Sequence, residues 1–130
     1  MTVFRRNMAG PEAHARVNAE RDRRLDLPLL FEGNLYDNDP GSRENIAGAA
    51  QQAMKAMVMN GAQPGDVMWH PDLKPFAFRT ADNRNVLMDA QTTSRLGDAA
   101  AARKGRVIFA AVALKSADVP LDFTDDRHWP

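Results

Sequence analysis

Clusters of Gly, Pro, Asn and Asp divide this sequence into long stretches with helical periodicity and short β-prone runs. Turns are predicted at residues 33–34, 39–41, 63–66 and 82–85. Helices are predicted over residues 11–24, 42–59 and 89–117, with short strands in the gaps between them. This order, α-ββ-α-βββ-α followed by a tail, predicts a small single α+β domain in which three helices pack against short antiparallel hairpins.

The first predicted helix is polar along most of its length. Pro11 suits its first position, and acid-before-base pairs four residues apart, Glu12–Arg16 and Glu20–Arg24, support it. Its few apolar residues are Ala13, Val17, Ala19 and Leu25. We therefore expect that no core face of its own holds this helix, and that it lies on the surface of something else or extends away from the domain.

The second predicted helix follows a hairpin. Gly33-Asn34 is expected to form the two-residue turn between β-prone runs over residues 29–37. Ser42 is the predicted N-cap of the helix and Gly61 the predicted C-cap. One face of the helix carries Ile46, Ala50, Ala53 and Met57. The small residues on that face indicate close packing against a neighbouring element.

Three more strands and a long third helix are predicted next. The strands are expected at residues 67–69, 76–80 and 86–88, and Asp89 is the predicted cap of the helix. Gly105 in the middle of this helix predicts a close crossing or a kink. The tail from Asp118 is expected to be irregular, with its aromatic residues docked on the domain.

Composition excludes several classes of protein. The chain has 17 basic and 17 acidic residues, which argues against a globally basic nucleic-acid binder, and it has no cysteine for disulfides or thiolate metal sites. No apolar stretch reaches the roughly 18–20 residues of a membrane span, and no secretory signal is expected. We divide the chain into a basic helical segment (1–27), an α+β core (28–117) and an acidic aromatic tail (118–130).

The charges are sorted toward the two ends of the chain. Residues 1–24 carry six arginines, including Arg5 and Arg6, against three acids (net +3), and residues 118–130 carry four aspartates against one arginine (net −3). We expect these ends to attract each other or a neighbouring copy. The candidate partner-interaction residues are Arg16, Arg21, Arg23, Arg24, Asp125, Asp126 and Trp129.

No motif for catalysis or cofactor binding stands out. His14, His70 and His128 lie in separate segments without metal-ligand spacing. Residues 37–44 lack the pattern of a calcium loop, because Pro40 and Gly41 follow the acidic run at once. Phosphate-binding, nucleophile-elbow and dinucleotide-binding motifs are absent. We therefore expect a protein that is not an enzyme, without catalytic residues, bound metal or cofactor.

An aromatic group and several methionines have two interpretations. Alternation places Phe76 and Phe78 on one face of a strand, with Trp69 nearby in the sequence. A core between sheet and helix is the favoured interpretation, and a partner or ligand platform is the alternative. We likewise favour a core position for Met54, Met57 and Met59, and an adaptable interface is the alternative.

The order of several short motifs resembles a known family. The motifs are Arg16–Arg24, Phe31-Glu32-Gly33, Arg43–Ala49, Gln63–Asp66, Trp69-His70, Met88–Thr92 and Asp125–Pro130. Together they resemble an uncharacterised phage-tail-associated domain of phages and prophages, which is often found near or within tail-fibre proteins. The resemblance covers approximately Ala15–Pro130. It implies a role in the virion or in tail assembly without catalysis.

The resemblance implies a structural protein of the distal tail, baseplate or fibre attachment, made in the bacterial host cytoplasm and located in the virion. Its partners would be other tail proteins, the tail fibre among them, and further copies of the chain in an oligomeric assembly, without nucleic acid. A tail-fibre assembly chaperone is one alternative. A small ligand-binding protein or enzyme that uses the region of Trp69 and His70 is the other.

Overall fold

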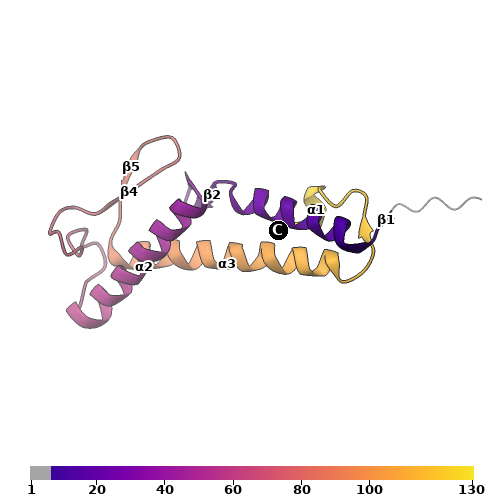
Figure 1. Cartoon of the computed structure of the whole chain (residues 1–130). Coiled ribbons are helices and arrows are strands. Elements are labelled where there is room, and N and C mark those ends of the chain that lie inside the picture. The colour runs from indigo at the N-terminus through magenta and orange to yellow at the C-terminus, as the bar shows by residue number, and fades with distance from the viewer. Residues whose placement is uncertain (1–6) are drawn as a thin grey trace, which may run out of the picture. The chain divides into compact units, whose positions relative to one another are not determined.

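The computed structural model describes residues 7–130 (Figure 1). Its helices are α1 (Gly10–Leu25), α2 (Pro40–Asn60), α3 (Ala90–Lys115) and a short 3-10 helix, η1 (Asp126–His128). Its strands are β1 (Asn7–Met8), β2 (Leu29–Phe31), β3 (Asn34–Tyr36), β4 (Ala77–Arg79), β5 (Asn85–Leu87) and β6 (Val119–Pro120). Within these residues the strands pair antiparallel as β1–β6, β2–β3 and β4–β5. Long helices with short antiparallel strand pairs confirm the predicted α+β class.

Contacts along the chain group it into two compact units. The terminal unit contains the described residues up to Leu25 together with Arg103–Pro130, and the central unit is Asp26–Ala102. Helix α3 gives its first part to the central unit and its last part to the terminal unit. The terminal unit therefore joins the basic helical segment to the acidic tail, which are far apart in the sequence.

In the terminal unit, α1 lies along the last part of α3, and both helices contribute to one core (Figure 1). Ala13, Val17 and Leu25 of α1 are buried in it. The other buried members are Val107, Ala111, Val119, Phe123 and Trp129. The helix lies at the surface, as expected, with most of its residues exposed or half-buried, but the expectation that it has no core face of its own is wrong. Its few apolar residues suffice because a partner helix and an aromatic tail cover them.

The tail is docked, as its aromatic residues predict. Phe123 and Trp129 are buried, and β6 pairs with β1 so that Met8 lies opposite Val119. The tail is more regular than expected, because it contains both β6 and η1.

In the central unit, the first predicted hairpin forms with its turn one residue earlier than expected. Phe31 pairs with Asn34, so Glu32 and Gly33 are the two turn residues. Their φ angles are +46° and +83°, respectively. Both turn positions of this mirror-image turn need positive φ, which fits the right-handed twist of the two strands. Asn34 begins β3 instead of occupying the turn.

Helix α2 begins earlier than its sequence signal indicated. Asp39 is the N-cap, and its Oδ2 accepts a hydrogen bond from the Ser42 N–H at 3.4 Å. Pro40 therefore occupies the first turn, where its missing N–H costs nothing. Ser42 is not the cap but donates its hydroxyl to Asp39, which lowers the pKa of the Asp39 carboxyl. Gly61 ends the helix in the left-handed conformation, at φ +65°, as predicted.

Residues 67 and 68 form a turn and Trp69 is irregular, so the predicted strand over residues 67–69 is absent. Asp66 accepts a hydrogen bond from the Met68 N–H at 2.8 Å, a side-chain bond that competes with strand pairing. The buried Trp69 ring packs against Phe76 at 4.7 Å between centroids and donates its Nε1–H to the Met88 carbonyl at 2.9 Å. The tryptophan is fixed by packing and by one buried hydrogen bond, without a β-ladder.

Helix α3 begins where Asp89 predicts, since the Asp89 Oδ1 accepts from the Thr92 N–H at 2.7 Å. The glycine at a close approach is Gly97, not Gly105. A side chain at Gly97 would collide with Ala50 of α2, whereas nothing lies within 4 Å of a side chain built at Gly105. The prediction of a close crossing at Gly105 is therefore wrong.

The core of the central unit consists of two adjoining clusters. The first contains Leu29, Tyr36, Ile46, Met88 and Leu96, and the second contains Ala53, Ala56, Trp69 and Ala90. Phe76 packs against both clusters, and Phe78 packs against the first. Because these two rings are only half-buried, they also border the surface.

Candidate functional site

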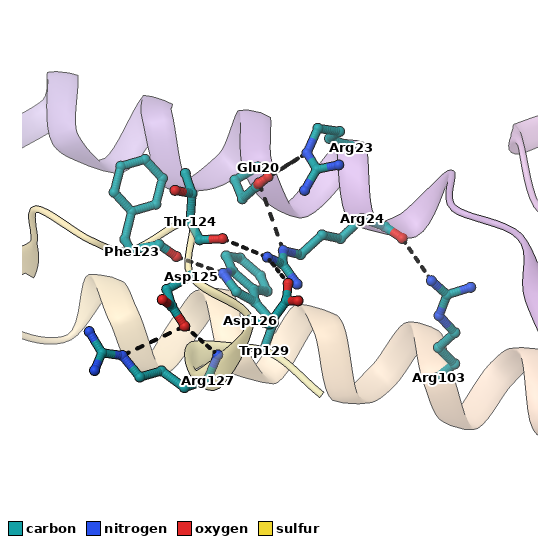
Figure 2. Close-up of polar contacts among 10 residues, drawn as sticks. All are labelled: Glu20, Arg23, Arg24, Arg103, Phe123, Thr124, Asp125, Asp126, Arg127 and Trp129. Carbon is teal, nitrogen blue, oxygen red and sulfur yellow. Dashed lines mark hydrogen bonds and ion pairs between the residues drawn. The ribbon is translucent and has the colours of Figure 1, made fainter.

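Arg24, in the last turn of α1, is a buried arginine that reaches the tail (Figure 2). Its Nη2 donates to the Thr124 main-chain carbonyl at 2.7 Å and to Asp126 Oδ1 at 2.9 Å. Its guanidinium carbon lies 5.2 Å from the centroid of the Trp129 ring, within the range of a cation–π interaction. One side chain thereby holds two parts of the tail and covers an aromatic ring.

Glu20, one turn before Arg24 on α1, is the buried acidic partner. Its Oε2 lies 3.7 Å from Arg24 Nε, and its Oε1 accepts from Arg23 Nε. The side chains of Glu20 and Arg24 are 6% and 9% exposed, whereas that of Asp126 is 97% exposed. The Glu20–Arg24 pair is therefore shielded, while water screens the charge of Asp126. The hydrogen bond with Glu20 raises the pKa of Arg23.

The tail is held in shape by its own hydrogen bonds. The Trp129 Nε1–H donates to the Phe123 carbonyl at 2.7 Å. Asp125 caps η1 by accepting from the Arg127 N–H at 3.0 Å, and the Arg127 guanidinium pairs with Asp122. Four of these residues also appear in Figure 2, below the α1 helix. The hydrogen bond of Trp129 with the tail thus helps to position its ring beside Arg24.

Two basic residues of α3 attach that helix to α1. Arg103 Nη2 donates to the Arg24 main-chain carbonyl at 3.0 Å, which gives a cationic partner to the end of α1. Lys115 Nζ donates to Asn18 Oδ1 at 2.6 Å. These two contacts fix the helices at separate points along their length.

The structure brings together three of the predicted interaction residues, Arg24, Asp126 and Trp129. The contact lies inside one chain and within the terminal unit. Contact between the two ends of the chain, one of the two predicted alternatives, is therefore present between a buried arginine, Arg24, and an exposed aspartate, Asp126. Arg5 and Arg6, which belong to the same basic segment, lie outside the described residues.

The remaining predicted residues lie nearby but bind within their own elements. Arg16 pairs with Glu12 at 3.2 Å, and Arg21 Nε donates to Asp22 at 2.9 Å. Arg23 binds Glu20, and Asp125 caps η1. These side chains remain at the surface of the terminal unit, with Arg21 half-buried.

Three partners in this network were missed at the level of sequence. Glu20 was interpreted only as a helix-stabilising charge, and its burial follows from the packing of α1. Thr124 contributes its main-chain carbonyl, so its side chain carries no signal. Arg103 could have been noted as a cation on the third helix, but its target is a main-chain atom 79 positions away.

The last part of α3 is apolar on more than one side. Residues 107–114 contain no charged or polar side chain. Val107 and Ala111 face the core, yet Ile108, Phe109 and Val112 are 36%, 74% and 54% exposed. A helix that is apolar all round is normally buried on every side. This exposed face, the α3 stripe (Ile108, Phe109, Val112), is therefore a candidate interaction surface.

A groove of about 630 Å³ lies in the central unit between α2 and β4. It is lined by Glu44, Asn45, Gly48, Ala49, Gln52, His70, Phe76, Ala77, Phe78 and Arg79. Its volume falls within the range of small-ligand sites, roughly 300–1,000 Å³. The His70 ring stacks on Phe76, with 5.5 Å between centroids and 16° between planes.

Among residues 7–130, no group of three or more His, Cys, Asp or Glu side chains is arranged to hold a metal ion. His70 has Asp72 beside it at 3.6 Å, and His128 has Asp122 at 3.0 Å, each as a single pair. No helix of this described part has the length and apolar character needed to cross a membrane.

Comparison with known proteins gives one match. Residues 9–126 match the model of a family described as a domain of unknown function (DUF4376). The match spans most of the chain, so the chain belongs to this family. No curated protein and no solved structure matches it.

Proposed function

We propose that this member of the DUF4376 family is a structural protein of a phage tail that acts by binding other proteins. The observation that carries the binding role is the α3 stripe, where Phe109 is 74% exposed on the outer side of a helix whose inner side is core. Burying such a ring against a partner removes apolar surface from water, which stabilises the complex by about 25 cal/mol for each Å² buried.

The charge pattern favours proteins over nucleic acid as partners. Lys104 and Arg106 flank the α3 stripe at the surface, but the chain as a whole has no net charge. Each arginine in the described part of α1 has an acidic side chain within ion-pair distance. The described part of α1 therefore carries no cluster of arginines without an acidic neighbour, which a phosphate backbone would favour.

The tail location is supported by the motif resemblance described for the sequence. It favours the distal tail, the baseplate or the fibre attachment site, in an assembly with further copies of the chain and with other tail proteins. Under this proposal the protein leaves the host cytoplasm as part of the virion and performs no catalysis.

Quantitative mass spectrometry of purified virions tests this role. We expect the chain at a fixed stoichiometry relative to the tail proteins, and we expect it to be retained through density-gradient purification. Its absence from mature particles, in lysates that contain it, would contradict a structural role.

A tail-fibre assembly chaperone is the second candidate function. The observation that favours it is an exposed methionine-rich face on α2, where Met54, Val58 and Met59 are 49%, 75% and 70% exposed. Flexible methionine side chains suit transient binding to varied apolar surfaces. Co-expression distinguishes the two roles: a chaperone raises the yield of trimeric fibre and is then absent from the particle, whereas a structural protein remains.

A further inference from the structure

Strand β4 has one edge that no strand covers in the described part of the chain. It pairs only with β5, with Phe78 opposite Val86. Hydrogen bonds from Met88 N–H to the Phe76 carbonyl and from Thr80 N–H to the Arg84 carbonyl show that alternate residues face β5. By the geometry of an antiparallel pair, the N–H and C=O groups of Ala77 and Arg79 point to the opposite side.

The same edge already binds an extended segment at its end. Ala81, the next residue in this alternating series, donates its N–H to the Leu35 carbonyl of β3 at 2.8 Å. The outward groups of Ala77 and Arg79 take part in no hydrogen bond of this kind among the described residues. The edge is therefore a row of main-chain donors and acceptors that is satisfied at one end and open along β4.

The groove described above runs along this edge. Four consecutive residues, 76–79, line one side of it, and one stripe of α2 lines the other. The members of that stripe, Asn45, Gly48, Ala49 and Gln52, recur at helical spacing and are small or polar. A side chain built at Gly48 meets nothing within 4 Å, which shows that the wall is open at its middle. About three residues of extended chain, at roughly 3.3 Å each, match the length of β4.

The side chains around the groove set the chemistry of an occupant. The half-buried rings of Phe76 and Phe78 provide apolar surface beside the edge. His70 stacks on Phe76, which places it toward the start of β4, while Arg79 ends the strand. Glu44 and Arg79 add one charge of each sign to the lining, so neither an anionic nor a cationic ligand is favoured as a class.

We propose that this groove binds an extended peptide segment of a partner protein, which adds to β4 as a third strand. The main chain of the segment pairs with Ala77 and Arg79, and an apolar side chain of the segment packs on Phe76 and Phe78. Main-chain pairing supplies affinity in this mode, and the side-chain pockets supply selectivity. The site is separate from the α3 stripe and does not depend on the tail role.

The unpaired edge of β4 favours an extended peptide as the occupant over a helix or a small molecule. A helix has no free main-chain groups to offer to Ala77 and Arg79, since its own are used internally. A small molecule would not need a row of alternating donors and acceptors at strand spacing. An extended chain matches both the row and the open α2 wall.

Capped hexapeptides that alternate Val, Leu or Phe with Thr are the probe, titrated into the isotopically labelled full chain and followed by amide NMR. We expect saturable shifts centred on Ala77 and Arg79 for at least one peptide of the set. Peptides that shift no β4 amide, or that shift amides all over the surface without saturation, would overturn the proposal.

Two comparisons then separate strand addition from general apolar binding. Gly48→Leu fills the groove and should weaken binding at least tenfold, whereas Ala47→Leu, an exposed α2 residue outside the lining, should leave it unchanged. The second comparison leaves the protein unaltered: N-methylation of alternate peptide nitrogens should abolish binding in one register only. Equal binding of methylated and unmethylated peptides would overturn the proposal even if Gly48→Leu failed to fold.

Discussion

The two units of the chain bury different kinds of polar residue. The terminal unit buries the charged side chains of Glu20 and Arg24. The buried polar residues of the central unit, Asn38, Thr80, Thr93 and Ser94, are all uncharged. Thr80 and Thr93 bind partners within four positions, whereas Arg24 binds Asp126, 102 positions away. The terminal unit thus adds a buried ion pair, with a long-range contact to the tail, to its apolar core, whereas the central unit combines apolar packing with uncharged buried polar groups.

This difference has a thermodynamic consequence. A buried ion pair contributes little net stability when intact, but removing one partner leaves the other charge buried and unpaired. A core of aliphatic and aromatic residues loses stability in proportion to the volume removed. The stability of the terminal unit should therefore depend strongly on Arg24. The stability of the central unit should depend on the volume of its buried apolar side chains.

The largest expected effect is that of Arg24→Ala in the terminal unit. This change removes the buried cation beside the Glu20 carboxylate, which keeps the more exposed Arg23 as a partner, and it uncovers Trp129, so we expect the free energy of unfolding to fall by about 3–5 kcal/mol. Urea denaturation measures it. Arg16→Ala, on the same helix but with a 58% exposed side chain, is the matched control and should change stability by less than about 0.5 kcal/mol. Equal losses in the two variants would contradict the charge-pairing account.

Reversing the charge of several arginines tests whether the attraction between the two ends depends on Arg24 alone. The opposite charges of the two ends predict that changing Arg21, Arg23 and Arg24 together to Glu weakens the protein, most strongly at low salt. We expect Arg24→Glu alone to cause most of that loss, because Arg21 and Arg23 pair at the surface of their own helix. If the three changes contribute equally, the attraction is diffuse and does not depend on the buried contact.

The next largest effect is expected for Leu96→Ala in the central unit. Leu96 is fully buried, so its truncation should cost about 3 kcal/mol through lost transfer energy and a residual cavity. The loss should be the same at low and high salt. Leu87→Ala, which removes a side chain that is 60% exposed, serves as the control with a small effect. A strong salt dependence of the Leu96 variant would argue against apolar packing as the main support of this unit.

Gly33→Ala should have a smaller effect, confined to the β2–β3 turn. No atom lies within 4 Å of the added methyl group, so the cost of about 1–2 kcal/mol comes from the positive φ of +83°. Gly48→Ala adds the same methyl group at an open helical position and should stabilise by up to about 1 kcal/mol. Thermal unfolding of both variants gives the comparison, and destabilisation by both would show that the backbone angle is not the cause.

The smallest expected effect is a loss of stability of the central unit at low pH. Hydrogen bonds from Ser42 and Thr80 lower the pKa values of Asp39 and Asp82. Burial opposes the shift at Asp89, but hydrogen bonds from Thr92 and Gly65 outweigh it and lower its pKa as well. Each carboxyl therefore adds stability that is fully present above the ordinary value of 3.8 and is lost as the pH falls through the folded pKa.

Carboxyl titration by NMR measures these three pKa values directly. Asp89→Asn should flatten the fall in stability below pH 3.8. Titration of all three carboxyls at or above 3.8 would contradict the assigned hydrogen bonds.

Local signals in the sequence predicted most elements and some of their ends. Gly61 and Asp89 were correctly expected as caps because each is the one strong signal at its helix end. Asp39 and Ser42 are both good caps three positions apart, and the sequence does not rank them. The hairpin turn shifted by one residue for a similar reason, since Glu32-Gly33 and Gly33-Asn34 both contain the glycine that the turn needs.

Features that depend on packing could not be predicted. Gly97 and Gly105 have similar helical surroundings in the sequence, and only the approach of Ala50 distinguishes them. The opposite charges of the two ends predicted an attraction but not that Arg24 would be its buried member. That choice depends on which face of α1 meets the core, and Thr124 contributes a main-chain atom with no side-chain signal.

Cross-linking in purified particles tests the central functional claim most directly. A photoreactive benzoylphenylalanine replaces Phe109 in the α3 stripe, and in a second variant it replaces Arg16 on α1, which is also exposed. We predict that position 109 cross-links to a tail protein or to a second copy of the chain in the particle, and that position 16 does so much less. A position 109 that stays unlinked, or that links no more than position 16, would contradict the proposal that this face holds the protein in a phage tail.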